Sequence, residues 1–321
     1  MSSAPFIPRR GAVIQKRSIP HVTKVLAIAS GKGGVGKSTV AGNFAAFTYR
    51  SLVVTLSPAN LAFSLAMHVA TSVGRRLRVG ILDLDIFGPS VPTLMGLQHS
   101  DEPPLTSSGA ILPIINHGLP TMSMGYLLPK SRDNVSREDV AVVWRGLMVQ
   151  KAVQQLLFDV DWRNSEQAGL DVLVIDMPPG TGDVPLTLGQ LVLVDGAVIV
   201  STPQDVALAD VRRGVSMFRK VSVPITGIML NQSYFVCPSC TTPHQLFGSP
   251  DAFRKIASTL RVDILGELPV VKGVSVGSDK GIPYALTSST EQTETDGAGG
   301  ALWRNVMKDA AARVWSSLCK E

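Results

Sequence analysis

Short apolar runs separated by longer helical patterns organise most of this 321-residue chain. Near-continuous apolar runs are typical of the buried strands of parallel sheets. Runs of this kind occupy residues 25–29, 79–82, 172–175, 197–201, 225–230 and, more weakly, 264–268. Helical periodicity lies between or after them, at residues 147–157, 205–221, 251–260 and 302–318. The alternation predicts an α/β fold, a parallel twisted sheet with helices on both faces, whose ligands bind beyond the carboxyl ends of the strands.

Two segments break this pattern. Residues 99–140 are rich in Pro, Gly and Ser and are expected to run over the surface. Residues 286–300 have the composition of a flexible connector to the last helix.

A glycine-rich loop follows the first apolar run and satisfies the pattern G-x-x-x-x-G-K-[ST]. Its residues are Gly31, Lys32, Gly33, Gly34, Val35, Gly36, Lys37 and Ser38, followed by Thr39. Glycines let backbone N–H groups curl around phosphate oxygens, and the following helix adds its N-terminal dipole. Lys37 is expected to reach the β- and γ-phosphates of ATP, and the Ser38 hydroxyl to bind Mg²⁺.

Polar residues follow other strands at the same expected edge. Asp83 and Asp85 follow the second apolar run, and Asp176 ends the third. Carboxylates there can position an attacking water or hold the metal through water. Asp83 as a structural cap stays open as an alternative, as does Asn231 after the fifth run as a turn residue.

The loop after Asp176 reads D-M-P-P-G-T-G-D. Gly180 and Gly182 would let this loop rearrange around the γ-phosphate. Asp183, which ends the motif, is alternatively a solvated loop acid.

The sequence G-K-G-G-V-G-K-S-T resembles the deviant Walker A loop of MinD, ParA and the nitrogenase iron protein. The resemblance implies that Lys32 reaches the nucleotide of a partner subunit in an ATP-sandwich homodimer; a solvated loop lysine is the alternative. It also implies that Asp85 positions the attacking water, that Asp176 holds the water molecules around the metal, and that Asn231 contacts the adenine.

Three cysteines are present, and Cys237 and Cys240 form a C-x-x-C pair. So few cysteines favour a reducing compartment over a disulfide framework. The pair alone fits zinc, redox or cluster chemistry, and zinc or an iron–sulfur cluster takes four thiolates. His244 is a poor third candidate and Cys319 is distant in sequence. A symmetric dimer would supply four thiolates, which favours a cluster shared by two chains; a redox pair is the main competitor.

Five motifs occur in order that resemble those of the Mrp-type iron–sulfur cluster carriers. They are D-L-D-I-F-G-P-S-V-P, V-V-W-R-G-L-M, D-M-P-P-G-T-G-D, S-T-P-Q-D-V-A-L-A-D and N-Q-S-Y-F-V-C-P-S-C. The resemblance covers about residues 18–285 and implies a MinD-like ATP-binding protein that carries a [4Fe–4S] cluster between two subunits to apo-proteins. R-S-I-P-H-V-T-K-V before the loop fits the mitochondrial NUBPL-type branch, which serves respiratory complex I assembly. The lack of any cysteine before Cys237 argues against the cytosolic branch.

Charge is uneven along the chain, whose net charge is +5. No acidic residue precedes Asp83, whereas the start is basic, so residues 1–20 resemble a mitochondrial transit segment. We expect the mitochondrial matrix; the cytoplasm is the alternative, because prolines interrupt an amphipathic helix there. The sequence lacks a basic run interleaved with aromatic residues, the pattern typical of nucleic-acid binding. It also has no apolar run as long as a membrane span.

The expected organisation is a leader (1–20), a P-loop ATPase domain (21–285), and a linker with a C-terminal helix (286–321). Residues 44–60 interrupt an amphipathic pattern that becomes continuous without them. We interpret them as a translated intron, with a genuine surface insertion as the alternative.

Two other functions remain open at this stage. A MinD- or ParA-like positioning ATPase would need a membrane helix or a nucleic-acid face, and residues 302–318 are the candidate helix. A nucleotide-dependent reductase like the nitrogenase iron protein is the weaker alternative. Whether slow ATP hydrolysis accompanies cluster transfer is also open.

Overall fold

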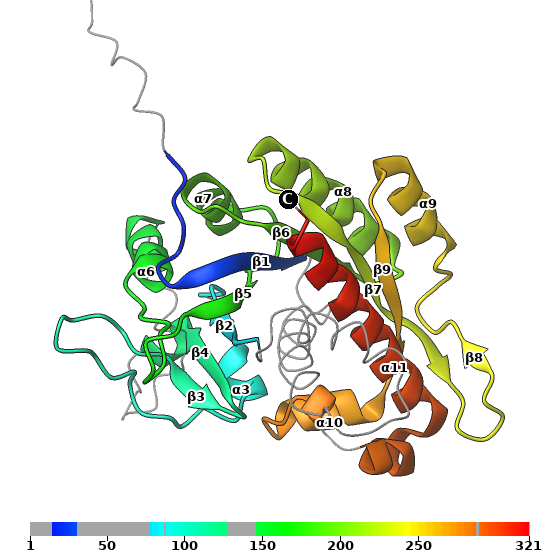
Figure 1. Ribbon diagram of the computed structural model, residues 1–321. Coiled ribbons are helices and arrows are strands. Elements are labelled where there is room, and N and C mark those ends of the chain that lie inside the picture. The colour runs from blue at the N-terminus through cyan, green and yellow to red at the C-terminus, as the bar shows by residue number, and fades with distance from the viewer. Residues whose placement is uncertain (1–14, 31–76, 87, 128–145, 287–288, 321) are drawn as a thin grey trace, which may run out of the picture.

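The computed structural model describes residues 15–30, 77–86, 88–127, 146–286 and 289–320 (Figure 1). Strands in these residues form one sheet in the order β3-β4-β2-β5-β1-β6-β7-β8, with β9 also beside β7. Their bounds are β1 Val22–Ser30, β2 Val79–Asp83, β3 Ile114–Asn116, β4 Leu119–Ser123, β5 Leu170–Asp176, β6 Gly196–Ser201, β7 Ile225–Val236, β8 Pro243–His244 and β9 Ile264–Val270. All six predicted strands are present, so the sequence pattern located the centre of the sheet.

The centre of the sheet is parallel, as predicted, and so is the pairing of β9 with β7, whereas two short outer strands pair antiparallel. β3 pairs antiparallel with β4, and β7 with β8. The β3–β4 hairpin lies in the segment 99–140, which was expected only to run over the surface, so these two strands were not predicted. Its turn places His117 and Gly118 at φ 50° and 77°, as two-residue hairpin turns require. Strands this short leave too little alternation for the pattern to predict them.

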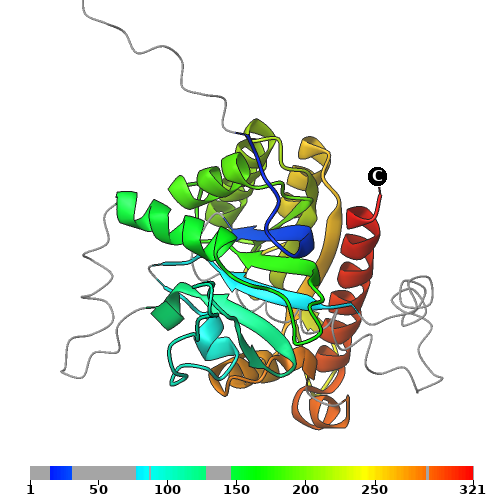
Figure 2. The same ribbon diagram turned by 60° about the vertical axis from the view of Figure 1, so that its left-hand side comes forward.

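Helices cover both faces of the sheet (Figures 1 and 2). Side chains alternate along β1, so that Val25 and Ala27 join one core cluster while Leu26 and Ile28 join the other. One face carries α4 Met124–Leu127, α6 Gly146–Phe158, α7 Asp183–Leu191, α8 Asp205–Lys220 and α9 Asp251–Leu260. The other carries α3 Val91–Leu94, α10 Lys272–Asp279, η1 Tyr284–Leu286 and α11 Ser289–Leu318. The predicted two-faced α/β architecture is confirmed, with a mixed sheet.

α11 begins earlier than the sequence indicates. Residues 289–300, expected to be a flexible connector, are helical, with a kink at Gly297 (φ 54°, ψ −138°). Tertiary contacts hold this part: the Asp296 carboxylate accepts hydrogen bonds from Gly273 N (2.9 Å) and Tyr284 Oη (2.8 Å). The ring of Tyr284 also packs edge-on against Trp303 at 5.1 Å. These distant partners override a local composition that favours a loop.

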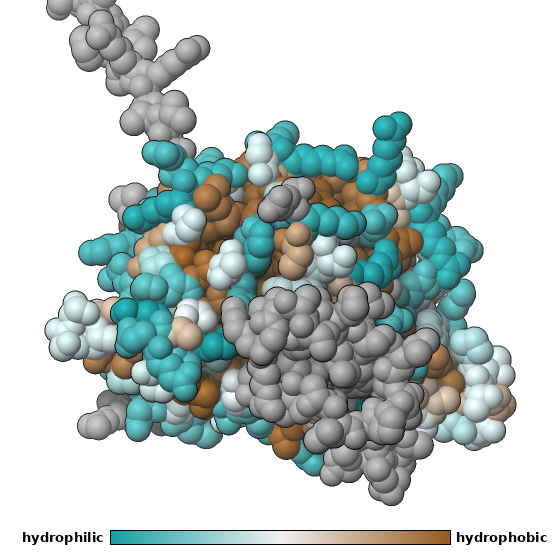
Figure 3. Space-filling view, in the orientation of Figure 1, coloured by the Kyte–Doolittle hydropathy of each residue, from teal (hydrophilic) through white to brown (hydrophobic). Residues whose placement is uncertain are grey.

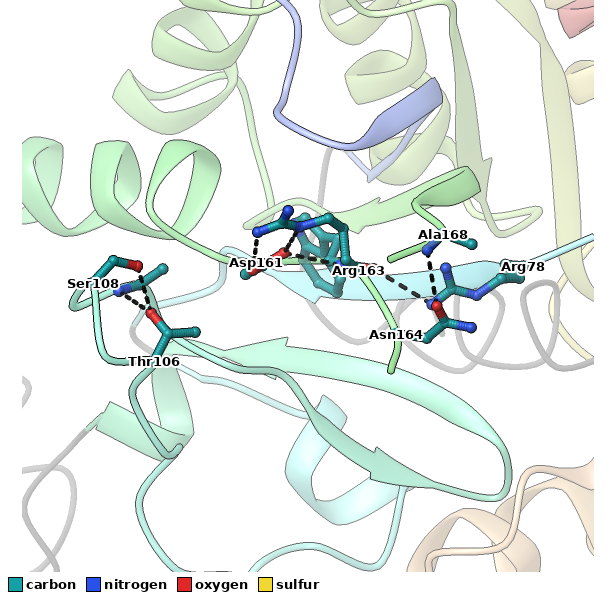
Figure 4. Close-up of polar contacts among 9 residues, drawn as sticks. Arg78, Thr106, Ser108, Asp161, Arg163, Asn164 and Ala168 are labelled. Atoms are coloured by element: carbon teal, nitrogen blue, oxygen red, sulfur yellow. Dashed lines mark hydrogen bonds and ion pairs between the residues drawn. The ribbon is translucent and has the colours of Figure 1, made fainter. Parts of the chain in front are cut away.

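Hydrogen bonds join the segments that lead into the strands, at the amino-terminal ends of the strands (Figure 4). Arg78 donates from Nη1 to Gly169 O (2.7 Å) and from its backbone N to Asp171 Oδ2 (2.6 Å). Arg163 bonds Asp161 through two nitrogens, and these bonds lower the pKa of Asp161 to about 2. This pair is partly exposed, so its net contribution to stability is small.

Residues 1–14 of the predicted leader (1–20) and the suspected insertion at 44–60 lie outside the described residues. Within the described part of the chain, no helix combines the length and hydropathy that crossing a bilayer requires.

Candidate functional site

Three central strands end side by side at the carboxyl edge of the sheet. Asp176 is in register with Asp83 on one side and with Ile28 on the other. Beyond the strands, Gly180 N donates to Ser30 O at 2.8 Å. Ser30 immediately precedes the glycine-rich loop, so the D-M-P-P-G-T-G-D loop is bonded to the chain where the phosphate loop begins. The structure confirms the expected meeting of these strand ends.

The phosphate loop itself lies outside the described residues. This applies to Gly31, Lys32, Gly33, Gly34, Val35, Gly36, Lys37, Ser38 and Thr39. Their roles therefore remain predictions from the sequence.

Asp83 has a structural role. Its fully buried carboxylate accepts hydrogen bonds from Asp85 N (2.9 Å), Val91 N (3.1 Å) and Ser123 Oγ (3.1 Å). It thereby ties the end of β2 to the start of α3 and the end of β4. The alternative of Asp83 as a structural cap is confirmed.

Replacing Asp83 with alanine should lower the free energy of unfolding by about 3 kcal/mol, because three donors lose their buried acceptor. The matched control is Asp85→Ala, whose carboxylate accepts only the longer bond from Gly88 N (3.2 Å) among the contacts of the described chain. We expect this variant to lose less than about 1 kcal/mol. Urea unfolding followed by circular dichroism measures both, and equal losses would contradict the assignment.

Asp85 and Asp176 are the carboxylates that the sequence predicts for nucleotide chemistry. Asp176 is fully buried at the end of β5, and Asp85 is 8% exposed just beyond β2. The following loop contains Gly180 at φ 91°, a conformation that glycine adopts without strain. Asp183 is exposed and begins α7, which agrees with a solvated acid. The positions fit the predicted roles of Asp85 and Asp176.

Asn231 lies within β7, which continues six residues beyond the predicted strand end. The strand is irregular here, with Gln232 at φ 55° and a register shift against β9 between Leu230 and Tyr234. Asn231 lines a cavity of about 600 Å³. Residues of α3, β9 and α10 line it as well, among them Thr93, Pro269, Val270, Ser275 and Ser278. A mixed polar and apolar cavity of this size suits a small ligand.

The extension of β7 leads directly into the cysteine pair. β8 pairs antiparallel with its end, placing His244 opposite Phe235. The turn between them is closed by Cys237 N to Thr242 O (3.0 Å) and Thr241 N to Cys237 O (2.8 Å). This hairpin extends from the body of the molecule (Figure 1).

The hairpin brings three potential metal ligands together. The ligand atoms of Cys237, Cys240 and His244 all lie within 4.8 Å of one another. His244 is therefore a close neighbour of the pair, and judging it a poor third candidate was wrong. The C-x-x-C-x-x-x-H spacing is the signal that would have identified it. Cys319, which follows α11, is not part of this group.

The hairpin also changes the acidity of one thiol. Hydrogen bonds from Thr242, with smaller effects of Cys237 and His244, lower the pKa of Cys240 to about 6. Burial instead raises the pKa of the Cys319 thiol. Cys240 is therefore mostly thiolate at neutral pH, the form that binds metal.

In metal-free protein, alkylation of Cys240 by iodoacetamide should rise with a midpoint near pH 6, because only the thiolate reacts. Cys319 should react only at clearly higher pH and serves as the internal control. Thr242→Val should move the Cys240 midpoint upward. Peptide mass spectrometry resolves the two sites, and identical profiles for both cysteines would contradict the assignment.

Comparison with known proteins shows which family this chain resembles. The family described as the NUBPL iron-transfer P-loop NTPase, of the ParA group, matches residues 57–306. The mouse iron–sulfur cluster transfer protein NUBPL is 43% identical over 88% of this chain and 76% of its own length. An Arabidopsis thaliana iron–sulfur protein required for NADH dehydrogenase, mitochondrial, is 42% identical over 83% and 73%. An iron–sulfur cluster carrier protein of Aquifex aeolicus is 41% identical over 85% and 64%.

Solved structures agree on the fold. A nucleotide-binding protein of Archaeoglobus fulgidus, in complex with ADP and with cobalt, has a TM-score of 0.59 and 30% identity, covering 82% of this chain and 88% of that one. MinD of Pyrococcus horikoshii with Mg-ADP has a TM-score of 0.54 at 18% identity, covering 90% and 94%, which supports the fold alone. Since the family match and these relatives each cover most of the chain, the protein belongs to the NUBPL iron-transfer P-loop NTPase family of iron–sulfur cluster carriers.

Proposed function

We propose that two copies of this protein hold a [4Fe–4S] cluster between them on Cys237 and Cys240, and that they transfer it to apo-proteins in an ATP-dependent manner. The observation that carries the proposal is the cysteine pair on a projecting hairpin. One chain brings only two thiols to this hairpin among its described residues, and a cubane takes four. A symmetric pair of hairpins supplies the other two.

The surroundings of the pair favour both assembly and release. Cys240 is exposed and Cys237 half-buried, so an acceptor's thiols can reach the cluster. Leu246 and Phe247, just beyond β8, are 58% and 39% exposed. The lobe that carries the hairpin shows pale and brown residues at its surface (Figure 3). A second copy that covers these side chains would gain apolar burial while bringing the cysteines together.

For the nucleotide, we propose ATP with Mg²⁺ on the glycine-rich loop. Lys37 and Ser38 would hold the phosphates and the metal, and Lys32 would reach the nucleotide of the second copy. Asp176 would hold the metal's water shell and Asp85 the attacking water. The cavity beside Asn231 would take the adenine. Support comes from the positions of Asp85 and Asp176 at one edge and from the ADP bound to the A. fulgidus protein.

We propose the mitochondrial matrix as the location and apo-subunits of respiratory complex I as recipients. The acid-free, basic start of the chain and the Arabidopsis relative's name support this. Arg17 N donates to Leu191 O and Ile19 is buried in the core, so the leader would be confined to the residues before Arg17. Residues 286–321 would belong to the ATPase body through α11. The cytoplasm is the alternative location.

The positioning-ATPase alternative loses its main support. It required a C-terminal amphipathic helix available to a membrane. In α11 the apolar side chains of Trp303, Met307 and Val314 are 2% exposed or less and belong to the core. A helix committed to the core cannot also insert into a bilayer.

Anaerobic reconstitution with iron and sulfide tests the proposal. We expect brown protein with about four irons per dimer, and a dimeric mass by sedimentation. Protein that retains its cluster while strictly monomeric would contradict the shared site.

A further inference from the structure

We propose that a single chain also binds one divalent transition-metal ion on Cys237, Cys240 and His244, with a fourth, open coordination position. The cluster proposed above needs two chains and uses only the cysteines. The present site needs one chain and adds His244 as a ligand. It deepens the proposed function at the same hairpin but does not depend on the dimer.

The backbone of one chain fixes the three ligands. Cys237 directly follows β7, and pairing of Phe235 with His244 brings the imidazole back alongside the thiols. Between them, Thr241 adopts φ 57° and reverses the chain, and its N–H bonds Cys237 O. The hairpin therefore gathers these side chains before any partner arrives.

The spacing suits one ion. A tetrahedral zinc with Zn–S bonds of about 2.3 Å and Zn–N bonds of about 2.0 Å places its ligand atoms about 3.4–3.8 Å apart. The three ligand atoms here lie within 4.8 Å of one another, so side-chain adjustments of about 1 Å complete the geometry. In a cubane each thiolate binds its own iron, which holds the sulfurs farther apart than two thiolates on a single ion.

The donor set selects the class of ion. Two soft thiolates and an imidazole favour Zn²⁺ or a similar ion over Mg²⁺ or Ca²⁺, which take oxygen ligands. Cys240 and His244 are both exposed, so the fourth position faces solvent and can take water or an incoming thiolate. Because a bound ion holds both thiolates, it excludes the cluster from the same chain until it leaves.

Titration of the full-length, reduced, metal-free protein with Co²⁺ tests the site. We expect one Co²⁺ per chain, sulfur-to-cobalt charge-transfer bands, strong visible bands of a tetrahedral ion, and a monomeric mass by sedimentation. His244→Ala and the more conservative His244→Gln should weaken binding at least about tenfold, since losing even an outer-shell partner of a metal ligand costs about 10–100-fold. Equal weakening in both variants assigns the loss to the imidazole.

Matched controls come from the same chain. Gln245→Ala alters the next, equally exposed residue, and Cys319→Ala removes the thiol outside the group. Both should bind Co²⁺ as the unaltered protein does. His244 variants that match these controls would overturn the inference, as would failure of the unaltered chain to bind Co²⁺, or binding only with two chains per ion.

A competition experiment separates this inference from the proposed carrier function. Zn²⁺ added first should slow cluster reconstitution in the unaltered protein and much less in His244→Ala. If the monomer binds Co²⁺ through His244 but no cluster forms, the carrier proposal fails and the ion site stands. If the cluster forms and zinc delays both proteins equally, the ion site fails and the carrier proposal stands.

Discussion

Cys237→Ala should lose more than about 90% of the iron and sulfide that the reconstituted protein holds, and Cys240→Ala should lose as much. The reason is stoichiometric: each substitution removes two of the four thiolates from a symmetric dimer, because both chains carry it. Two remaining thiolates leave half the cluster's irons without a protein ligand. Iron and sulfide analysis under anaerobic conditions, with the visible absorption of the cluster, measures the loss.

The control for this result is Cys319→Ala. This cysteine lies after α11 and outside the hairpin group, so its removal should leave iron content unchanged. A loss of iron in Cys319→Ala equal to that in Cys237→Ala would show that the ligands were wrongly assigned. Mixed dimers with one altered chain sharpen the test, since they should hold a cluster less stably than the unaltered dimer.

Lys37→Ala should weaken ATP binding by about 100-fold or more. An ammonium on the β- and γ-phosphates contributes charge-assisted hydrogen bonds whose loss costs about 1.5–3 kcal/mol, and the charge attraction disappears with them. Each 1.4 kcal/mol corresponds to about tenfold in affinity. Isothermal titration calorimetry with ATP and Mg²⁺ gives the dissociation constant, and an unchanged value would contradict the assignment of the phosphate loop.

Lys32→Ala is the informative companion to that variant. If Lys32 acts on the nucleotide of a second copy, the isolated chain should bind ATP nearly normally. ATP-dependent dimerisation, followed by sedimentation, should instead be lost. Normal dimerisation of the Lys32→Ala variant would instead assign Lys32 as a solvated lysine of the loop.

Most of the parallel centre of this fold is predictable from sequence because buried strands flanked by crossover helices leave continuous apolar runs. The β3–β4 hairpin is not, since its stability comes from pairing with β2 and not from its own pattern. The early part of α11 is another instance: Asp296 is held by Gly273 and Tyr284, partners that its local sequence cannot reveal.

The candidate site divides in the same way. Motifs identify Asp85, Asp176 and the cysteine pair because their chemistry requires particular residue types at particular spacings. The C-x-x-C-x-x-x-H spacing also indicates His244, and pairing across the hairpin shows that it is a neighbour of the cysteines. The bonds by which Asp83 ties β2 to α3 and β4 come from donors that the motif does not reveal.

β7 has a consequence for how this protein can vary. β7 carries Asn231 at the cavity, is irregular at Gln232, and ends one residue before Cys237. At about 3.3 Å per residue of extended chain, six residues span at most about 20 Å between Asn231 and Cys237. Deleting a single residue near Gln232 would turn every later side chain to the opposite face of the sheet. We therefore expect insertions and deletions to be tolerated after β8 but to be removed by selection between Asn231 and the cysteines. The number of residues in this interval should then distinguish functional genes from non-functional copies.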